Sequence, residues 1–582
     1  MTTVPSGTET HDSQSSVRAP STVATYFVEL LEDAGVDRVY TVPGGTLLPI
    51  LEALGKSPCI RTVCCKDESG AAAAADGHAW ATDGVSVVLT IGGPGVTNAL
   101  TGIGASALQR NPVLLVSGEV ATTMGGLRAA QDSTCFGVNA TAMSRPATAL
   151  SVECSSAEQA AFALEEALRR AIRLRRPVHV AIPLDVQRAH VLPRSSRKMA
   201  VPQHVPRGVA SEALADAAAI LRRCERIALL VGGGARRAGP EIVGLADRIG
   251  APIATTCSGK GIVPEYHPLS IGVFSLGGSP LARDVLTSRL DALIAVGTGL
   301  GEFATMNYSD AIVPDLALVH IDEDPVVFDR RYKCFPLCGD AAEAVRGLAG
   351  GLDERPAPIW TSSFLSARSR FSQPDALHSG AVPIRPERLV HEIELALPPE
   401  SRVLADIGTS CLFVAHCMRL RPGQRSYIPM GWSCMGHPIA AALGVRLGSG
   451  LPTVCVAGDG AFLSKGLEIH TAVEQGVSGL IYVVLSNGGH ALVRMGTLAV
   501  LGPTENVEMG SVRVAPDIAR IARGLGAEGL RVDAPDDIAT ALQHGLNCGR
   551  PCVIDVRVDP DARPPMEDRI QNIAGTVPRV GT

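Results

Sequence analysis

The chain has 582 residues, a hydrophobic fraction of 46% and a net charge of −6. This length is typical of three or four domains with hydrophobic cores. The acidic balance and an aromatic fraction of only 4% disfavour a nucleic-acid-binding protein and a protein held on an anionic membrane. No apolar stretch is long enough to cross a membrane. The fifteen cysteines include no Cys-x-x-Cys pair, which favours reduced thiols in a cytoplasmic protein.

Residues 1–22 are rich in Ser and Thr and predict a disordered N-terminal segment. Beyond them, strand-like and helix-like patterns alternate in three segments. Such alternation predicts an α/β protein with three doubly wound domains, each built on a parallel sheet. We expect the domains at residues 23–192, 208–350 and 384–560, followed by an extended tail over residues 561–582.

The first segment begins with a helix pattern over residues 22–34. Its apolar runs predict strands at residues 38–42, 62–65, 87–91, 113–117 and 178–183. A connector at 193–207 leads to the second segment, which opens with a helix over 211–223 and a strand over 227–231. A second connector at 351–385 leads to the third segment, which runs from a helix at 386–397 to a strand at 552–558.

Two strand ends in the third segment carry the most informative residues. A predicted strand at 453–457 leads into Gly458-Asp459-Gly460-Ala461-Phe462, and a predicted strand at 479–485 leads into Ser486-Asn487-Gly488-Gly489-His490. Mg²⁺ prefers hard oxygen ligands and commonly shares them with phosphates. An isolated Gly-Asp-Gly is usually only a turn. Its strand context and the following Asn487 resemble the diphosphate motif of thiamine diphosphate enzymes.

A second carboxyl group lies in the first segment. Glu68 follows an apolar strand and starts a helix of small residues, which could lie close against another backbone. A carboxyl at this place is often a helix cap or a partner of the helix dipole. The functional alternative is the carboxyl that thiamine needs at N1′ of its aminopyrimidine. That contact favours the imino tautomer, whose N4′ removes the C2 proton.

From about residue 24 to residue 558 the chain resembles the acetolactate synthase and pyruvate oxidase branch of thiamine diphosphate enzymes. The similar motifs occur in the family's order: Val42-Pro43-Gly44-Gly45, Gly93-Pro94-Gly95-Val96-Thr97-Asn98, Val231-Gly232-Gly233-Gly234, Gly259-Lys260-Gly261 and Asp322-Glu323-Asp324-Pro325. In that family the cofactor lies between the first domain of one subunit and the third domain of its partner. The resemblance therefore implies at least a homodimer, with a tetramer as the larger alternative.

The resemblance also implies a set of site residues. The residues expected in catalysis are Glu68, Gln131 and Gly44. Those expected to bind the cofactor are Glu68, Pro43, Asn98, Ser433, Met435, Gly458, Asp459, Gly460, Ala461, Asn487 and Gly489. The metal ligands would be Asp459, Asn487 and the Gly489 carbonyl. Met435 would hold the cofactor bent, and core packing is its alternative role. Gln131 would polarise the substrate, with an ordinary loop amide as the alternative.

Three departures from the family pattern concern the substrate and a second cofactor. Ala130 replaces an aromatic residue before Gln131. The stretch Gly297-Thr298-Gly299-Leu300 lacks the Arg that contacts FAD in acetolactate synthases, so we expect that FAD is not bound. In the family, a Trp after the stretch that matches His490 to Gly496 recognises the second oxo acid, and no Trp follows that stretch in this chain. His437 and His490 are either acid–base groups, anion ligands or packing residues.

The sequence thus predicts a thiamine diphosphate- and Mg²⁺-dependent enzyme that acts on a 2-oxo acid, with pyruvate as the expected donor. The main interpretation is acetolactate synthase-like formation of a carbon–carbon bond. One alternative is a simple decarboxylase, similar to phosphonopyruvate or sulfopyruvate decarboxylases, that releases an aldehyde. Another is a catalytically silent homologue that acts as an oligomeric or regulatory partner. The presence of Glu68, Asp459 and Asn487 argues against the silent alternative.

Overall fold

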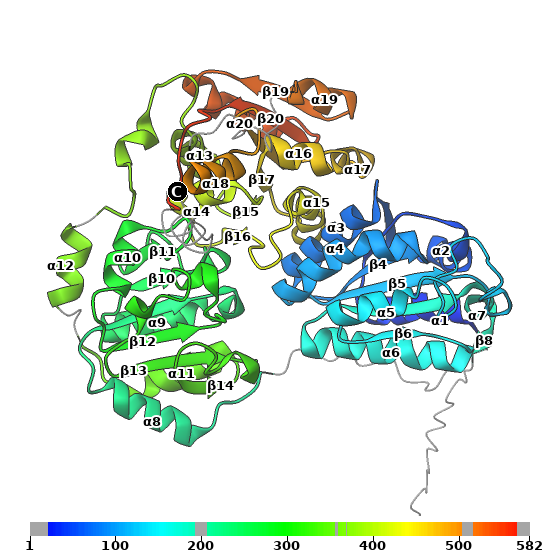
Figure 1. Cartoon of the computed structure of the whole chain (residues 1–582), viewed down its shortest axis with the longest axis horizontal. Helices are drawn as coiled ribbons and strands as arrows, with labels where there is room; N and C mark the ends of the chain where they lie inside the picture. The colour runs from blue at the N-terminus through cyan, green and yellow to red at the C-terminus, as the bar shows by residue number, and fades with distance from the viewer. Residues whose placement is uncertain (1–20, 192–205, 356–358, 368, 503–515, 567–582) are drawn as a thin grey trace, which may run out of the picture. The chain divides into compact units, whose positions relative to one another are not determined.

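The structure, a computed structural model, describes residues 21–191, 206–355, 359–367, 369–502 and 516–566. Its strands form three six-stranded sheets and one two-stranded pair (Figure 1). Every neighbouring pair of strands within the three larger sheets is parallel. The predicted α/β class with three doubly wound parallel sheets is confirmed.

The first sheet has the strand order β3-β2-β4-β5-β7-β6. Its strands are β2 (Arg38–Thr41), β3 (Arg61–Cys64), β4 (Ser86–Ile91), β5 (Val113–Glu119), β6 (Ser151–Glu153) and β7 (Val178–Pro183). The helices of this part of the chain are α1 (Val23–Asp33), α2 (Leu48–Gly55), α3 (Glu68–Thr82), α4 (Pro94–Gln109), α5 (Ala140–Ser144), α6 (Ala157–Leu174) and α7 (Leu184–Arg188). The strand order reverses between β2 and β4, and ligands of such sheets bind at the carboxyl ends beside this switch point.

The second sheet has the order β11-β10-β9-β12-β13-β14. Its strands are β9 (Ile227–Val231), β10 (Ile253–Thr255), β11 (Ser270–Val273), β12 (Ala292–Val296), β13 (Ala317–Asp322) and β14 (Phe335–Cys338). Its helices are α8 (Ser211–Leu221), α9 (Gly239–Ile249), α10 (Pro280–Leu286), α11 (Ala341–Gly351) and α12 (Ile359–Ala367). Alternate residues of β12 enter two different hydrophobic clusters, because both faces of a doubly wound sheet are covered.

The third sheet has the order β16-β15-β17-β18-β20-β19. Its strands are β15 (Arg402–Ala405), β16 (Arg425–Tyr427), β17 (Thr453–Gly458), β18 (Leu480–Ser486), β19 (Glu528–Val532) and β20 (Cys552–Arg557). Its helices are α13 (Pro386–Ala396), α14 (Thr409–Cys417), α15 (His437–Ser449), α16 (Asp459–Lys465), α17 (Glu468–Glu474), α18 (Ala491–Leu501), α19 (Ile518–Gly524) and α20 (Ile538–Asn547). Here the order reverses between β15 and β17, which places the switch point beside Asp459.

The chain divides into two compact units. The first comprises the described residues within Met1–Cys64, Val85–Leu100 and Pro112–Gln203. The second comprises the described residues within Cys65–Gly84, Thr101–Asn111 and His204–Thr582. Helix α3, which begins with Glu68, therefore belongs to the same unit as the second and third sheets.

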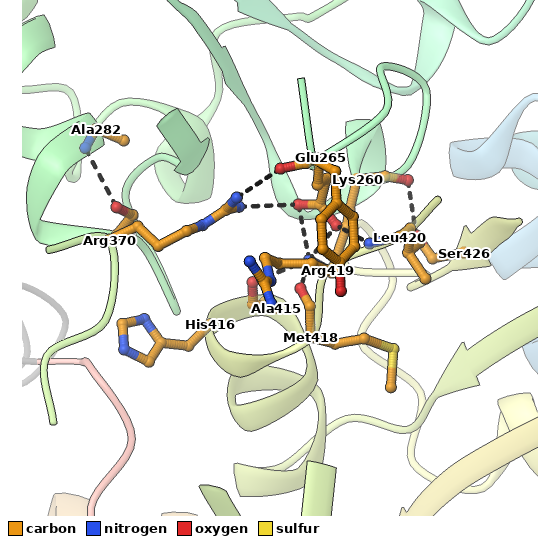
Figure 2. A network of polar contacts seen from close by, with 12 residues as sticks. Lys260, Glu265, Ala282, Arg370, Ala415, His416, Met418, Arg419, Leu420 and Ser426 are labelled. Atoms are coloured by element: carbon orange, nitrogen blue, oxygen red, sulfur yellow. Dashed lines mark hydrogen bonds and ion pairs between the residues drawn. The ribbon is translucent and has the colours of Figure 1, made fainter. Parts of the chain in front are cut away.

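A buried ion pair of the second sheet's segment makes hydrogen bonds to the third sheet's segment (Figure 2). Lys260 is 1% exposed, and its ammonium donates to both carboxylate oxygens of Glu265 at 2.9 and 2.8 Å. It also donates to the Met418 carbonyl at 2.6 Å, while Leu420 N donates to Glu265 at 2.9 Å. A buried charge pair needs such additional hydrogen bonds to offset its desolvation. The Gly-Lys-Gly motif that resembles the family's middle domain therefore has a structural role here.

Both ends of the described chain differ from the sequence expectations. Ser21 and Thr22, within the segment expected to be disordered, form strand β1 (Ser21–Thr22) with β8 (His190–Val191). The rest of that segment lies outside the described residues, as does most of the expected tail. Met566 packs into the third sheet's core. All fifteen cysteines lie in the described residues, and none of them forms a disulfide bond. No helix among the described residues is long and apolar enough to span a membrane.

Candidate functional site

Asp459 and Asn487 lie at the same edge of the third sheet. Strands β17 and β18 are parallel neighbours, and Gly458 is paired with Leu485 in their register. Asp459 follows β17 directly, and Asn487 follows β18 directly. The carboxylate and the amide that the sequence predicted as metal ligands thus meet at the carboxyl ends of two adjacent strands, as ligand sites of this sheet type do.

Asp459 is held by backbone amides. It is 4% exposed, and its carboxylate accepts from Gly460 N and from Gly488 N, each at 2.8 Å. Burial raises the pKa of Asp459, while these amide donors oppose the rise. A divalent cation would remove the remaining cost of the buried charge, because it stabilises the ionised form.

The backbone around Asp459 leaves room for a ligand. A Cβ placed at Gly458 or at Gly488 would meet no atom within 4 Å, and Gly488 has a φ of +84°. Gly460 is different, because a Cβ there would lie 2.5 Å from Cε1 of His490. Ala461 is buried in α16. No described group of three or more His, Cys, Asp or Glu side chains could hold a metal ion. The donor set at this edge has one carboxylate, one amide and one carbonyl, which suits a cation that retains phosphate and water ligands.

The loop before α15 carries Ser433 and Met435. Ser433 adopts a left-handed conformation with a φ of +53°, and its hydroxyl donates to the Met430 carbonyl at 2.6 Å. Met435 is 38% exposed, which contradicts its alternative role as a core residue. The loop ends at Gly436, whose amide donates to both carboxylate oxygens of Asp406 at 3.0 Å. Non-glycine residues in this conformation occur at functional sites more often than elsewhere.

Asp406 anchors that loop through the Gly436 amide. It follows β15, is fully buried, and lies beside the switch point. Burial raises the pKa of Asp406 to about 7, and the Gly436 amide opposes the rise. The sequence analysis did not identify this residue, although a carboxyl directly after a predicted buried strand is a usable signal.

Glu68 begins α3 and is 8% exposed. The N-cap of this helix is Asp67, whose carboxylate accepts from Gly70 N at 2.9 Å. The alternative role of Glu68 as the helix cap is therefore taken by its neighbour. Glu68 is instead a buried carboxyl in the first helical turn, although a simple interaction with the helix dipole would be satisfied at the surface.

Helix α3 packs very closely against α15. A Cβ at Gly77 would lie 2.2 Å from the Ala441 carbonyl oxygen, and a Cβ at Gly444 would lie 1.8 Å from the Ala74 carbonyl oxygen. Only glycine permits this approach of two helix backbones. The expectation that the small-residue helix lies against another backbone is confirmed. In this single chain the partner is α15 of the same unit.

The two histidines that the sequence left open have different neighbours. His437 Nε2 lies 2.8 Å from Asp76 Oδ2, and both side chains are buried. Tyr427 and Asn111 also donate to Asp76. This network links the start of α15 to α3, which favours the packing role of His437. The His490 ring lies against Gly460, beside the expected metal ligand.

The remaining predicted site residues lie in the first unit. Pro43 and Gly44 follow β2, and a Cβ at Gly44 would lie 2.2 Å from Ile91 Cγ2. Asn98 lies in α4 and is exposed. Gln131 is exposed, has a φ of +63°, and packs its backbone against Gly93. They therefore gather near the carboxyl ends of β2 and β4, beside the first sheet's switch point.

A buried carboxyl below the Gln131 loop was missed. Glu119 ends β5, is 1% exposed, and accepts from Ser117 Oγ at 2.8 Å and from Ser133 Oγ. Burial raises the pKa of Glu119, and the two hydroxyl donors oppose the rise. Ser133 lies two residues after Gln131, so Glu119 fixes the base of that loop. Lys465, at the end of α16, was also missed.

Comparison with known proteins identifies the family. Residues 21–145 match the N-terminal TPP-binding domain of thiamine pyrophosphate enzymes, residues 214–348 match their central domain, and residues 406–556 match their C-terminal TPP-binding domain. The chain belongs to the thiamine pyrophosphate enzyme family. The three matches follow one another in the order of the three sheets.

Relatives that match nearly the whole chain indicate to which branch of the family it is similar. IlvB2 of Mycobacterium tuberculosis, named as an acetolactate synthase large subunit, is 31% identical over 94% of this chain and 99% of its own. The acetolactate synthase large subunit of Corynebacterium glutamicum is 28% identical over 93% of this chain and 87% of its own. AruI of Pseudomonas aeruginosa, named as a 2-ketoarginine decarboxylase, is 30% identical over 92% of this chain and 94% of its own.

A solved structure supports the fold. Benzoylformate decarboxylase from Polynucleobacter necessarius superposes with a TM-score of 0.81 over 93% of this chain and 99% of its own, at 22% identity. The acetolactate synthase large subunits among the relatives confirm the acetolactate synthase-like branch. The chain is a thiamine diphosphate-dependent enzyme of the decarboxylase and carboligase class, which contradicts the catalytically silent alternative.

Proposed function

We propose that this enzyme decarboxylates a pyruvate-like 2-oxo acid and joins the remaining fragment to a second carbonyl compound. The observation that carries the proposal is the meeting of Asp459 and Asn487 at one sheet edge, in the unit that also contains buried Glu68. The acetolactate synthases among the relatives support the carbon–carbon bond-forming outcome.

In this proposal Asp459, Asn487 and the Gly489 carbonyl bind Mg²⁺. Each can supply oxygen: Asp459 uses the lone pairs that its two amide donors leave, and the Gly489 carbonyl accepts one hydrogen bond, from Ala491 N at 3.0 Å. A diphosphate and a water would complete the octahedron that Mg²⁺ prefers. Gly458, Gly460 and Ala461 would place backbone beside the diphosphate.

Glu68 would hold a proton at N1′ of the aminopyrimidine and so control its tautomer. Thiamine diphosphate supplies the nucleophilic carbon and the electron sink for decarboxylation. The Ser433 carbonyl would accept from N4′, the Met435 amide would donate to the pyrimidine ring, and the exposed Met435 side chain would support the bent cofactor. Asp406 keeps this loop in place through Gly436.

The substrate side rests on residues of the first unit. Gln131 would polarise the 2-oxo acid carbonyl. The turn formed by Pro43 and Gly44 would let the backbone approach the reacting carbon closely. Asn98 would contact the cofactor from α4. Support for these roles comes from their common place at the first sheet's switch point. We also propose a homodimer at least and a cytoplasmic location, which fits the fifteen free thiols.

The enzyme is proposed to work without FAD. Its Gly232 turn is explained by packing, because a Cβ there would lie 2.4 Å from the Gly297 carbonyl. Leu300, where an Arg would face a flavin, is buried. Losing a charge-assisted hydrogen bond weakens binding by roughly ten- to a hundredfold, at about 1.5–3 kcal/mol for the bond. We expect purified protein without a flavin absorbance band. A stoichiometric band that persists through gel filtration would contradict this.

Release of an aldehyde is the second candidate function. AruI and the benzoylformate enzyme are both named as decarboxylases. The lack of a Trp after His490 also removes a side chain that would read an acceptor.

Product analysis separates the two functions. Purified protein would be incubated with pyruvate, thiamine diphosphate and Mg²⁺, with CO₂ release and products measured together. A new carbon–carbon bond supports the main proposal, and free aldehyde alone supports the second candidate. No CO₂ from pyruvate or from a panel of other 2-oxo acids would contradict both.

A further inference from the structure

Lys465 contacts both neighbours of Glu68. Its ammonium lies 2.8 and 3.0 Å from the two carboxylate oxygens of Asp67 and also donates to the Ser69 hydroxyl. These two residues flank Glu68 in the chain. Lys465 is the last residue of α16, the helix that begins at Asp459. One side chain therefore connects the Glu68 segment to the helix of the expected metal ligand, across 398 positions of sequence.

The aliphatic part of the same side chain lies against the Met435 loop. A Cβ at Gly436 would be 2.7 Å from Lys465 Cγ and 3.1 Å from its Cβ. Gly436 directly follows Met435 and has a φ of +84°. Lys465 thus lies against residues next to Glu68 and next to Met435. These are the side chains proposed to contact the aminopyrimidine and to support the bent cofactor.

A second carboxyl on the neighbouring helix holds the same segment. Glu468, 2% exposed in α17, accepts from Lys66 N at 2.9 Å and from Asp67 N at 3.2 Å. The approach is so close that a Cβ at Gly70 would lie 2.2 Å from Glu468 Oε1. The backbone before Glu68 is fixed by Glu468, and the side chains on either side of Glu68 are fixed by Lys465.

We propose that Lys465 is a positioning residue that sets where the Glu68 carboxyl stands when it contacts the aminopyrimidine of bound thiamine diphosphate. The inference rests on the proposed role of Glu68. Lys465 is 20% exposed and Asp67 is 39% exposed. Burial alone would raise the pKa of Asp67, but the hydrogen bonds from Lys465 and Ser69 outweigh burial and hold that pKa below its usual range. The Asp67 carboxyl is therefore ionised at neutral pH.

The expected effect is on geometry rather than on cofactor retention. A displacement of about 1 Å of a catalytic group can slow a reaction about a hundredfold. Loss of one of several contacts should displace Glu68 by less, so we expect C2-proton exchange of bound thiamine diphosphate to slow about tenfold in Lys465→Met. The metal ligands stay intact, so the affinity for thiamine diphosphate should change less than about threefold.

The test is a double-mutant cycle of Lys465→Met and Asp67→Asn, read by C2-proton exchange and by near-ultraviolet circular dichroism of the bound cofactor. Asn is as good an N-cap as Asp, so Asp67→Asn removes the charge and keeps the α3 cap. Each single variant should slow exchange about tenfold, the double variant should be no slower than either, and Lys465→Arg should restore the rate. A double variant slowed by the product of the single effects would overturn the proposal.

Glu474→Gln is the matched control. It breaks the ion pair between Lys66 and Glu474 of α17, in which Lys66 Nζ lies 2.6 Å from Glu474 Oε2, and it touches neither chain neighbour of Glu68. We expect wild-type exchange in this control, and exchange in Lys465→Met within twofold of it would sink the proposal. Glu68→Gln separates the proposed role of Glu68 from that of Lys465. A wild-type exchange rate in Glu68→Gln refutes the proposed role of Glu68. Slow exchange there with a wild-type rate in Lys465→Met refutes only the role of Lys465.

Discussion

Replacing Gly444 by Ala should push α3 and α15 apart. The added Cβ would lie 1.8 Å from the Ala74 carbonyl oxygen and 2.9 Å from His78 N, whereas real Cβ contacts are essentially never under 3.0 Å. Relief of the contact with the Ala74 oxygen requires a shift of at least about 1.2 Å, the difference between 1.8 Å and the lower limit of 3.0 Å. Both atoms belong to helix backbones, so no side-chain rotation can provide the shift.

The shift should reduce both stability and catalysis. Overpacking of this kind costs about 1–3 kcal/mol, and the upper end applies because backbone must move. A gain of up to about 1 kcal/mol from replacing a helical glycine offsets part of it. The net loss of about 2 kcal/mol corresponds to a melting temperature lower by roughly 4–8 °C. A shift of about 1 Å should also slow C2-proton exchange about a hundredfold, because α3 carries Glu68 and α15 follows Met435.

Gly244→Ala is the control for this prediction. Gly244 lies inside α9, is exposed, and a Cβ there meets no atom within 4 Å. This variant should melt at or slightly above the wild-type temperature, with unchanged exchange. Thermal unfolding of the apoprotein and exchange at saturating cofactor measure the two effects. If Gly444→Ala behaved like Gly244→Ala in both assays, the close contact of α3 and α15 would be refuted.

Two further predictions concern buried carboxyls. Asp459→Ala should weaken thiamine diphosphate binding about a hundredfold or more in calorimetry at fixed Mg²⁺, and unchanged binding would make Asp459 only a turn residue. Asp406 has a pKa raised from 3.8 to about 7, so its neutral form is favoured by folding. Its contribution to stability is complete below the unfolded pKa and is lost as pH rises to about 7, at most about 4 kcal/mol. Urea midpoints of apoprotein at pH 4.5 and 7.5 should therefore differ less in Asp406→Asn, and equal differences would contradict this.

Strands were the elements that the sequence predicted best. Strands β7 and β9 have the expected bounds, because each is a short apolar run closed by a Pro or Gly turn. Helix ends were less accurate: α8 ends at Leu221, two residues before the expected end, because local patterns do not determine where a final turn frays.

The motifs predicted the sheet edge of the site because they are local. Asp459 and Asn487 each follow a strand, and parallel strands bring their carboxyl ends together. The helix cap shows the limit of such reasoning. Asp67 and Glu68 are adjacent acids, and only the backbone conformation reveals that Asp67 is the cap.

Contacts between distant segments could not be predicted. Lys465 and Asp67 are 398 residues apart, and His437 and Asp76 are 361 residues apart. The sequence around each of these residues does not indicate its partner, since the pairing depends on how whole segments pack. The sequence did contain a signal for this packing. Gly77 in α3 and Gly444 in α15 destabilise their helices unless another backbone comes close.

The most direct test of the account is C2-proton exchange of bound thiamine diphosphate in Glu68→Gln. Gln keeps the size of the side chain but cannot hold the N1′ contact as a carboxyl does. We expect exchange to slow by about a hundredfold or more, the usual scale of a general acid–base group, with the cofactor still bound. A wild-type exchange rate in the fully loaded variant would contradict the central claim that Glu68 activates the cofactor.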